Sequence, residues 1–140
     1  MSKRNGSGLE GLDLANKKGF KYGKLERADV LTMLRMGLIL VDTNRGKSYR
    51  LQRDESLSEM AQFTDHAGRA AVRVYWGKKR CGIMVNVLTW MAHHLRLPGE
   101  GMDIDHIDGN NRNDCIDNLA EVPMSINRSL GQQEIEKEFV

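Results

Sequence analysis

Residues 102–127 read MDIDHIDGNNRNDCIDNLAEVPMSIN, and this stretch decides the expected fold. Residues 102–106 alternate and predict a strand that ends in Asp105 and His106. A polar loop rich in Gly and Asn follows, then residues 119–122 predict a second strand, and a short helix starts near Pro123. This order of elements places Asn127 one turn inside the helix.

The loop between the two predicted strands is crowded with acids. Five aspartates lie between residues 103 and 117, and Arg112 is the only base among them. Because like charges repel, these carboxylates either spread into water or are neutralised by a cation. Hard oxygen donors favour magnesium, manganese or calcium over zinc or copper.

An EF-hand calcium loop is excluded by its own spacing. That loop needs Gly at position 6 and a carboxylate ligand at positions 1 and 12. With Gly109 at position 6, those two positions fall on Ile104 and Cys115. An open site for one metal ion remains, in which Asp105 and Asn127 supply oxygens and His106 stands beside them as a base.

The motif that runs through this segment resembles that of the HNH endonucleases, in particular the free-standing, homing-type enzymes of phages and introns. It reads Gly99-x-Gly101-x-x-x-Asp105-His106-Ile107-Asp108-Gly109-Asn110, then Asn118-Leu119, then Asn127. The three name-giving positions fall on His106, Asn118 and Asn127, which are separated by 12 and nine residues. The resemblance covers residues 70–130. It departs from the usual residues at Asn86, Cys115, Ala120, Pro123 and Leu130.

The resemblance implies a ββα-metal finger that hydrolyses DNA phosphodiester bonds. Asp105 and Asn127 would hold one Mg²⁺ or Mn²⁺ ion, and His106 would deprotonate the attacking water. Asn118 would brace the loop and orient His106 through hydrogen bonds. The expected products carry 5′-phosphate and 3′-hydroxyl ends.

The whole chain is therefore expected to be a small α+β protein in four parts. Residues 1–23 form a flexible basic segment, and residues 24–68 form a lead module with a helix and a hairpin. Residues 69–131 form the HNH nuclease domain, whose ββα-metal core is 102–131, and residues 132–140 form a tail. Within the lead module, residues 52–69 are expected to be a linker with one short helix near Leu57, Met60 and Ala61.

A β-hairpin and a helix are expected before the metal finger. Val72, Val74 and Trp76 share one face of the first strand, whereas Arg73 and Tyr75 share the other. Residues 77–79 turn the chain back, and residues 87–97 have the apolar spacing of a helix.

Basic residues predict the surface that meets double-stranded DNA. The candidates are Arg69, Arg73, Lys78, Lys79, Arg80, Arg112 and Arg128, with Arg45, Lys47 and Arg50 as a second patch. Lys and Arg side chains on a hairpin also protect an exposed strand edge from pairing with another strand. Both interpretations of these residues, DNA contact and edge protection, stay open.

Composition narrows the class of protein. The chain has 140 residues, a net charge of +2 and two cysteines, Cys81 and Cys115, that form no metal or disulfide framework. No window approaches the roughly 18 apolar residues of a membrane span. We expect a cytoplasmic protein, in the host cell if phage-encoded, with no organic cofactor.

Two alternatives remain: a DNA-binding module that keeps the fold without turnover, and a metal-stabilised interaction domain. The oligomeric state, and whether one DNA strand or both are cut, stay open.

Overall fold

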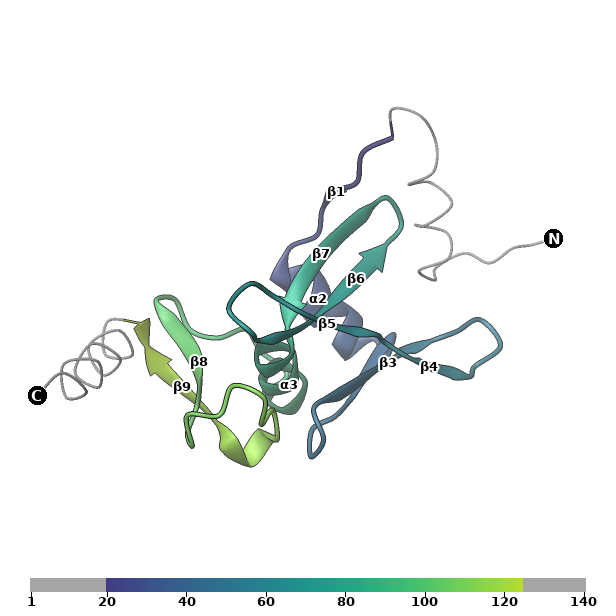
Figure 1. The fold of residues 1–140 in the computed structure, drawn as a ribbon. Coiled ribbons are helices and arrows are strands. Elements are labelled where there is room, and N and C mark those ends of the chain that lie inside the picture. The colour runs from purple at the N-terminus through teal and green to yellow at the C-terminus, as the bar shows by residue number, and fades with distance from the viewer. Residues whose placement is uncertain (1–19, 125–140) are drawn as a thin grey trace, which may run out of the picture.

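The computed structural model describes residues 20–124, which form a mixed α+β fold (Figure 1). The elements are β1 (Gly23–Lys24), α2 (Arg27–Arg35), β2 (Ile39–Asp42), β3 (Lys47–Leu51), β4 (Leu57–Glu59), β5 (Gln62–Thr64), β6 (Ala70–Trp76), β7 (Lys79–Met84), α3 (Val85–His94), β8 (Met102–His106), a 3-10 turn (Ile116–Asn118) and β9 (Leu119–Pro123). The strands form three sheets with the orders β1-β7-β6-β5, β2-β3-β4 and β8-β9. The α+β class is confirmed.

Helix α3 forms the centre of the core. All residues from 85 to 91 are buried, which is typical of a helix covered on every side. The helix contacts α2 and strands from all three sheets (Figure 1). It ends earlier than expected because Leu95 adopts a left-handed conformation (φ 53°) and its N–H donates to the Met91 carbonyl. Arg35 of α2 closes this end by donating to the Leu95 carbonyl at 2.7 Å.

The hairpin β6–β7 confirms the alternation expected from the sequence. Val72 and Val74 are fully buried and pair with Ile83 and Cys81, whereas Arg73 between them is exposed. One face of the hairpin therefore covers the core, and the other carries the exposed side chain of Arg73.

The end of the basic N-terminal segment is held against this hairpin. Strand β1 runs parallel to β7, and the Gly23 N–H donates to the Lys78 carbonyl at 2.9 Å. The ring of Tyr22 lies between those of Phe20 and Tyr75. Residues 20–23 thus differ from the flexible segment expected there, because aromatic packing and strand pairing fix them. Residues 1–19 lie outside the described residues.

The expected short helix near Leu57, Met60 and Ala61 is wrong. Residues 57–59 and 62–64 form two short strands, and these join the lead hairpin and the β6–β7 sheet respectively. An aspartate forms a turn on each side of these two strands. Before β4, Asp54 accepts from the Ser56 N–H, and after β5, Asp65 accepts from the Ala67 and Arg69 N–H groups. These competing side-chain bonds favour turns over a helix.

Strands β8 and β9 form the antiparallel pair expected around the motif. His106 is the register partner of Leu119, and Asp105 is that of Ala120. The segment after Met124, with Asn127 and Arg128, lies outside the described residues, so the expected helix of the finger is a prediction. Neither α2 nor α3 has the length and apolar character needed to cross a membrane.

Candidate active site

Strand β8 carries Asp105 and His106 at consecutive positions, so their side chains point to opposite faces of the strand. Ile104 and His106 are buried, whereas Asp103 and Asp105 are half-buried, so alternate side chains face the core. Asn86 of α3 fixes the strand: its buried amide donates to the Ile104 carbonyl at 2.9 Å. This bond gives a role to an Asn that departs from the usual motif residue, a role that the sequence did not predict.

The imidazole of His106 has one close partner, Asp114. The His106 Nε2 and Asp114 Oδ1 atoms lie 2.8 Å apart, and each side chain is only 9% exposed. An ionised carboxylate can only accept hydrogen bonds, so the neutral tautomer of His106 that fits this contact carries its hydrogen on Nε2 and its lone pair on Nδ1. A neutral imidazole held in this tautomer can accept a proton at Nδ1.

Asn118 organises the loop between the strands. Its amide donates to Asp108 Oδ1 and to the Asn113 carbonyl, both at 2.9 Å, and its side-chain oxygen accepts from the Asp108 N–H. The Asn118 carbonyl also accepts from the Ile107 N–H at 2.8 Å. These bonds reach the loop around Asp108, whereas the ring of His106 bonds to Asp114.

Asp108 is the acceptor at the centre of this loop. It accepts from the side chains of Asn113 and Asn118 and from the Asn110 N–H. The Asn113 bond is the largest of the causes that hold the pKa of Asp108 below its ordinary value, followed by the Asn110 and Asn118 bonds. The loop is thus closed by hydrogen bonds to one ionised carboxylate.

The donor chemistry near β8 fits a hard divalent cation. Asp105 offers a half-buried carboxylate, and the small side chain of Ala120 stands opposite it on β9. Among residues 20–124, no group of three or more His, Cys, Asp or Glu side chains is placed to hold a metal ion. The expected second ligand, Asn127, lies beyond that range, so a metal site here depends on an amide oxygen from the following segment.

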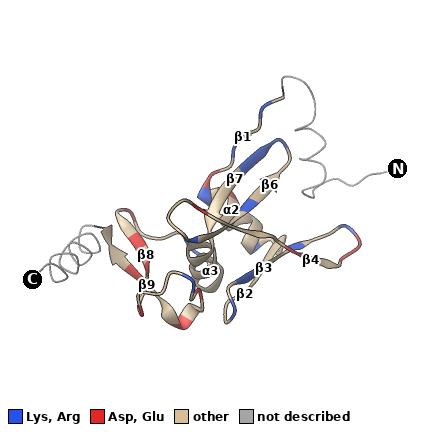
Figure 2. Cartoon of the chain, in the orientation of Figure 1, with Lys and Arg blue, Asp and Glu red and all other residues tan. Residues whose placement is uncertain are grey.

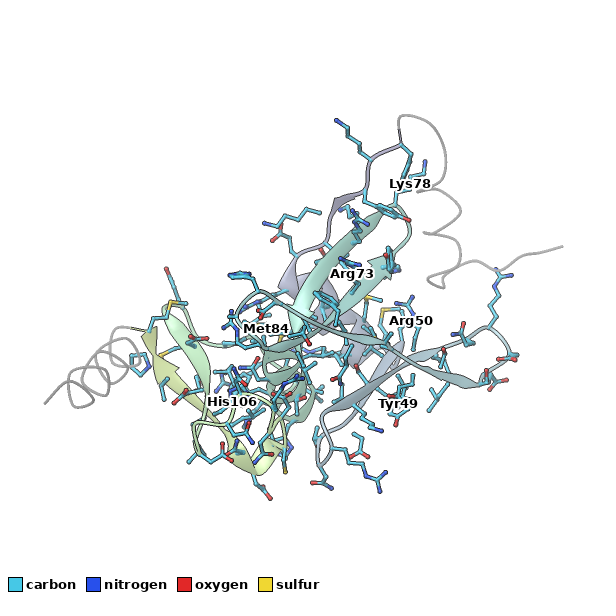
Figure 3. The ribbon with its side chains drawn as sticks, in the orientation of Figure 1. Tyr49, Arg50, Arg73, Lys78, Met84 and His106 are labelled. Carbon is cyan, nitrogen blue, oxygen red and sulfur yellow. The ribbon has the colours of Figure 1, made fainter. Side chains whose placement is uncertain are left out.

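The lysines and arginines expected to bind DNA differ in their exposure and in their partners. The hairpin β6–β7 exposes Arg73 and Lys78, which Figure 3 labels, and also Lys79 and Arg80. Lys and Arg gather on this hairpin, whereas Asp and Glu gather around β8 and β9 (Figure 2). Arg112 is exposed on the motif loop. Arg69 is half-buried, and its Nε lies 3.3 Å from Asp65 Oδ2.

Two of these guanidinium groups are stacked on aromatic rings. Arg73 lies 4.8 Å from the ring centroid of Phe63, and Arg80 lies 4.6 Å from that of Tyr22. Register pairing places Arg73 opposite Gly82 and Arg80 opposite Tyr75, on the face of the sheet away from Val72 and Val74. Stacking reduces the freedom of the two long side chains on this face.

The prediction of a second basic patch is wrong for one of its three residues, Arg50. Arg50 is buried, and its Nη1 donates to the Tyr75 carbonyl at 2.9 Å, which joins β3 to β6. Burial lowers the pKa of this guanidinium. Arg45, on the β2–β3 turn, and Lys47, at the start of β3, are exposed.

Comparisons with known proteins identify the family of the motif segment. A model of the HNH endonuclease family matches residues 84–129, which include α3, both motif strands and the loop that holds His106. This segment belongs to the HNH endonuclease family. No curated protein sequence matches the chain.

The chain is also similar to a solved structure. The fold is similar to that of I-HmuI, an HNH homing endonuclease solved in a study of its DNA binding and cleavage, with a TM-score of 0.55 and 24% sequence identity. The similarity covers 67% of this chain and 51% of I-HmuI, so the chain spans about half the length of that protein. At this identity the likeness shows the fold alone.

Proposed function

We propose that this protein is a metal-dependent DNA endonuclease. The observation that carries the proposal is the family match over residues 84–129, within which His106 is a buried imidazole in a fixed hydrogen bond. I-HmuI is a homing endonuclease that binds and cleaves DNA, which supports DNA as the substrate. We propose that the substrate is double-stranded and that the enzyme is of the homing type and phage-encoded.

In the proposed reaction, His106 is the general base. Nε2 is engaged by Asp114, so Nδ1 is the nitrogen that takes a proton from water. The water oxygen then attacks phosphorus in line with the leaving 3′ oxygen. The bond between phosphorus and that oxygen breaks, and the leaving oxygen takes a proton from solvent water, which gives 5′-phosphate and 3′-hydroxyl ends.

Asp105 and Asn127 are proposed to hold one Mg²⁺ or Mn²⁺ ion. When bound, the ion stabilises charge on the phosphate and on the leaving oxygen. Asn118 contributes by holding Asp108 and the loop that follows His106.

The β6–β7 hairpin is proposed to dock the duplex. Its exposed bases are Arg73, Lys78, Lys79 and Arg80, and phosphate contacts from such side chains set position on DNA without reading sequence. Further phosphate contacts are proposed for Arg69, Arg112 and Arg128. Arg69 also forms an ion pair with Asp65.

A cleavage assay tests this proposal. The substrates are supercoiled plasmid and DNA that flanks the protein's own gene, with Mg²⁺ or Mn²⁺, and each reaction is repeated with a chelator and with His106→Ala. His66→Ala is the matched control, because His66 is an exposed histidine on a turn far along the chain from the motif. We expect cleavage by the wild type and the control, and none with chelator or His106→Ala. Cleavage by His106→Ala at the wild-type rate would refute the assignment of the base.

A DNA-binding module without turnover is the second candidate. It is favoured by one observation: the stacked pairs Arg73–Phe63 and Arg80–Tyr22 lie outside the family-matched segment, so the basic face does not depend on a catalytic loop. Tight DNA binding with no cleavage under any divalent ion would establish that candidate instead.

A further inference from the structure

The loop that holds the His106 ring is itself held by the lead module. The Ile116 N–H donates to the carbonyl of Thr43 at 2.8 Å. Thr43 and Gly46 belong to the turn between β2 and β3, about 70 residues before the loop and outside the family-matched segment. A part of the chain unrelated to the motif therefore sits against it.

Gly46 of this turn lies very close to Asp114 of the motif loop. It is buried, and a Cβ built on it would lie 2.8 Å from Asp114 Cβ and 3.3 Å from the Asp114 carbonyl oxygen. Its φ of +64° is in the left-handed region that favours glycine. Any larger residue at position 46 must therefore displace the backbone of Asp114 or its own.

The β2–β3 turn is rigid enough to act as a support. The Gly46 N–H donates to the Asp42 carbonyl at 2.9 Å, and the Asn44 N–H donates to Asp42 Oδ1 at 3.1 Å. From the other side, Gln62 Nε2 donates to the Gly46 carbonyl at 2.9 Å. The turn thus has a fixed position relative to both neighbouring sheets.

We propose that Asp114 is a positioning residue for His106, and that the β2–β3 turn, through Gly46, sets where Asp114 stands. The inference rests on the proposed function, since it assigns a part in catalysis to a contact between the lead module and the HNH segment. Asp114 accepts from Nε2, which fixes the ring plane and leaves Nδ1 for water. Loss of such a partner lets the ring rotate and exchange tautomers.

The hydrogen on Nε2 of His106 gives a direct test. In nitrogen-15-labelled protein without metal or DNA, at about pH 8 and so above the usual His pKa of about 6.5, we expect a ring Hε2 signal that exchanges slowly with water. The chain has four histidines, and His106→Gln assigns the signal. Asp114→Ala is expected to abolish it, and Gly46→Ala is expected to weaken or shift it.

Gly37→Ala is the matched control. Gly37 also has a positive φ, +75°, but an added Cβ meets nothing within 4 Å. It therefore carries the same kind of backbone strain without touching the loop, and the His106 signal should be unchanged. Backbone amide spectra of each variant report whether it is folded. If Gly46→Ala does not fold, Asp114→Ala carries the test.

Cleavage kinetics separate positioning from DNA binding. Asp114→Ala is expected to lower kcat by about 10- to 100-fold, by analogy with the loss of a partner that orients a metal-ligating histidine, with KM for DNA within about twofold of wild type. An Hε2 signal that survives in Asp114→Ala, or an unchanged kcat, would overturn the proposal. Because the spectra need no turnover, loss of the signal in a protein that cleaves nothing would support the placement and count only against the proposed function.

Discussion

Replacing the four exposed bases of the β6–β7 hairpin should weaken DNA binding in a salt-dependent way. The variant changes Arg73, Lys78, Lys79 and Arg80 to Gln together. All four side chains are exposed, so the fold should be retained.

The size of the effect follows from the number of charges. Each phosphate neutralised on a duplex contributes about 0.9 to the slope of log K against log salt, so four contacts contribute about 3.6. Between about 50 and about 200 mM salt, a slope of 3.6 corresponds to a loss of about 150-fold in affinity. The wild type should therefore lose about 150-fold more affinity over that range than the variant.

Fluorescence anisotropy with a labelled duplex measures both slopes. Arg27→Gln is the control, because it removes one charge from α2. The charge of Arg27 influences the Cys81 thiol. Cys81 and Arg80 are consecutive on β7 and so point to different faces of the sheet, which places Arg27 away from the Arg80 side. The slope of this control should match that of the wild type. Equal slopes for the wild type and the fourfold variant would refute the docking surface.

Three further results are expected. Asn86→Ala should lower the free energy of unfolding in urea by about 1–3 kcal/mol, because it leaves the buried Ile104 carbonyl without its donor; a change below a few tenths would contradict the role of this bond. Hydrogen bonds hold the pKa of Asp108 below its ordinary value, so its stabilising effect should be complete above about pH 4 and should fade as pH falls through the lowered pKa; thermal melts of wild type and Asp108→Asn should converge in acid, and a constant difference would refute this. A chelator should stop cleavage and leave DNA affinity within about tenfold, because the hairpin bases and not the ion carry most phosphate contacts; complete loss of binding would contradict that division.

The sequence predicted the elements whose pattern is local. Alternation of Val72, Arg73 and Val74 identified the hairpin, because one face of the sheet is buried and the other exposed. The same rule applied to β3 would have placed Ser48 and Arg50 together on the inward face, where both are buried. The basic character of Arg50 alone predicts a DNA-binding residue, but its position on β3 buries it.

The contacts missed from the sequence are those made by folding. Asp114 was one of several loop aspartates, and nothing in its spacing distinguishes the partner of His106 from Asp108 or Asp117. The approach of Gly46 to Asp114 joins segments about 70 residues apart, so only the tertiary structure reveals it. The strands at 57–59 and 62–64 were missed because each is three residues long, too short for a clear period.

The central claim is that His106 activates the water that attacks DNA. The most direct measurement is the single-turnover cleavage rate with protein in excess over DNA, for wild type, His106→Ala and the control His66→Ala. We predict that His106→Ala lowers the rate by about 10²- to 10⁴-fold with unchanged DNA affinity, and that His66→Ala has no effect. A rate for His106→Ala equal to that of the wild type would contradict the claim.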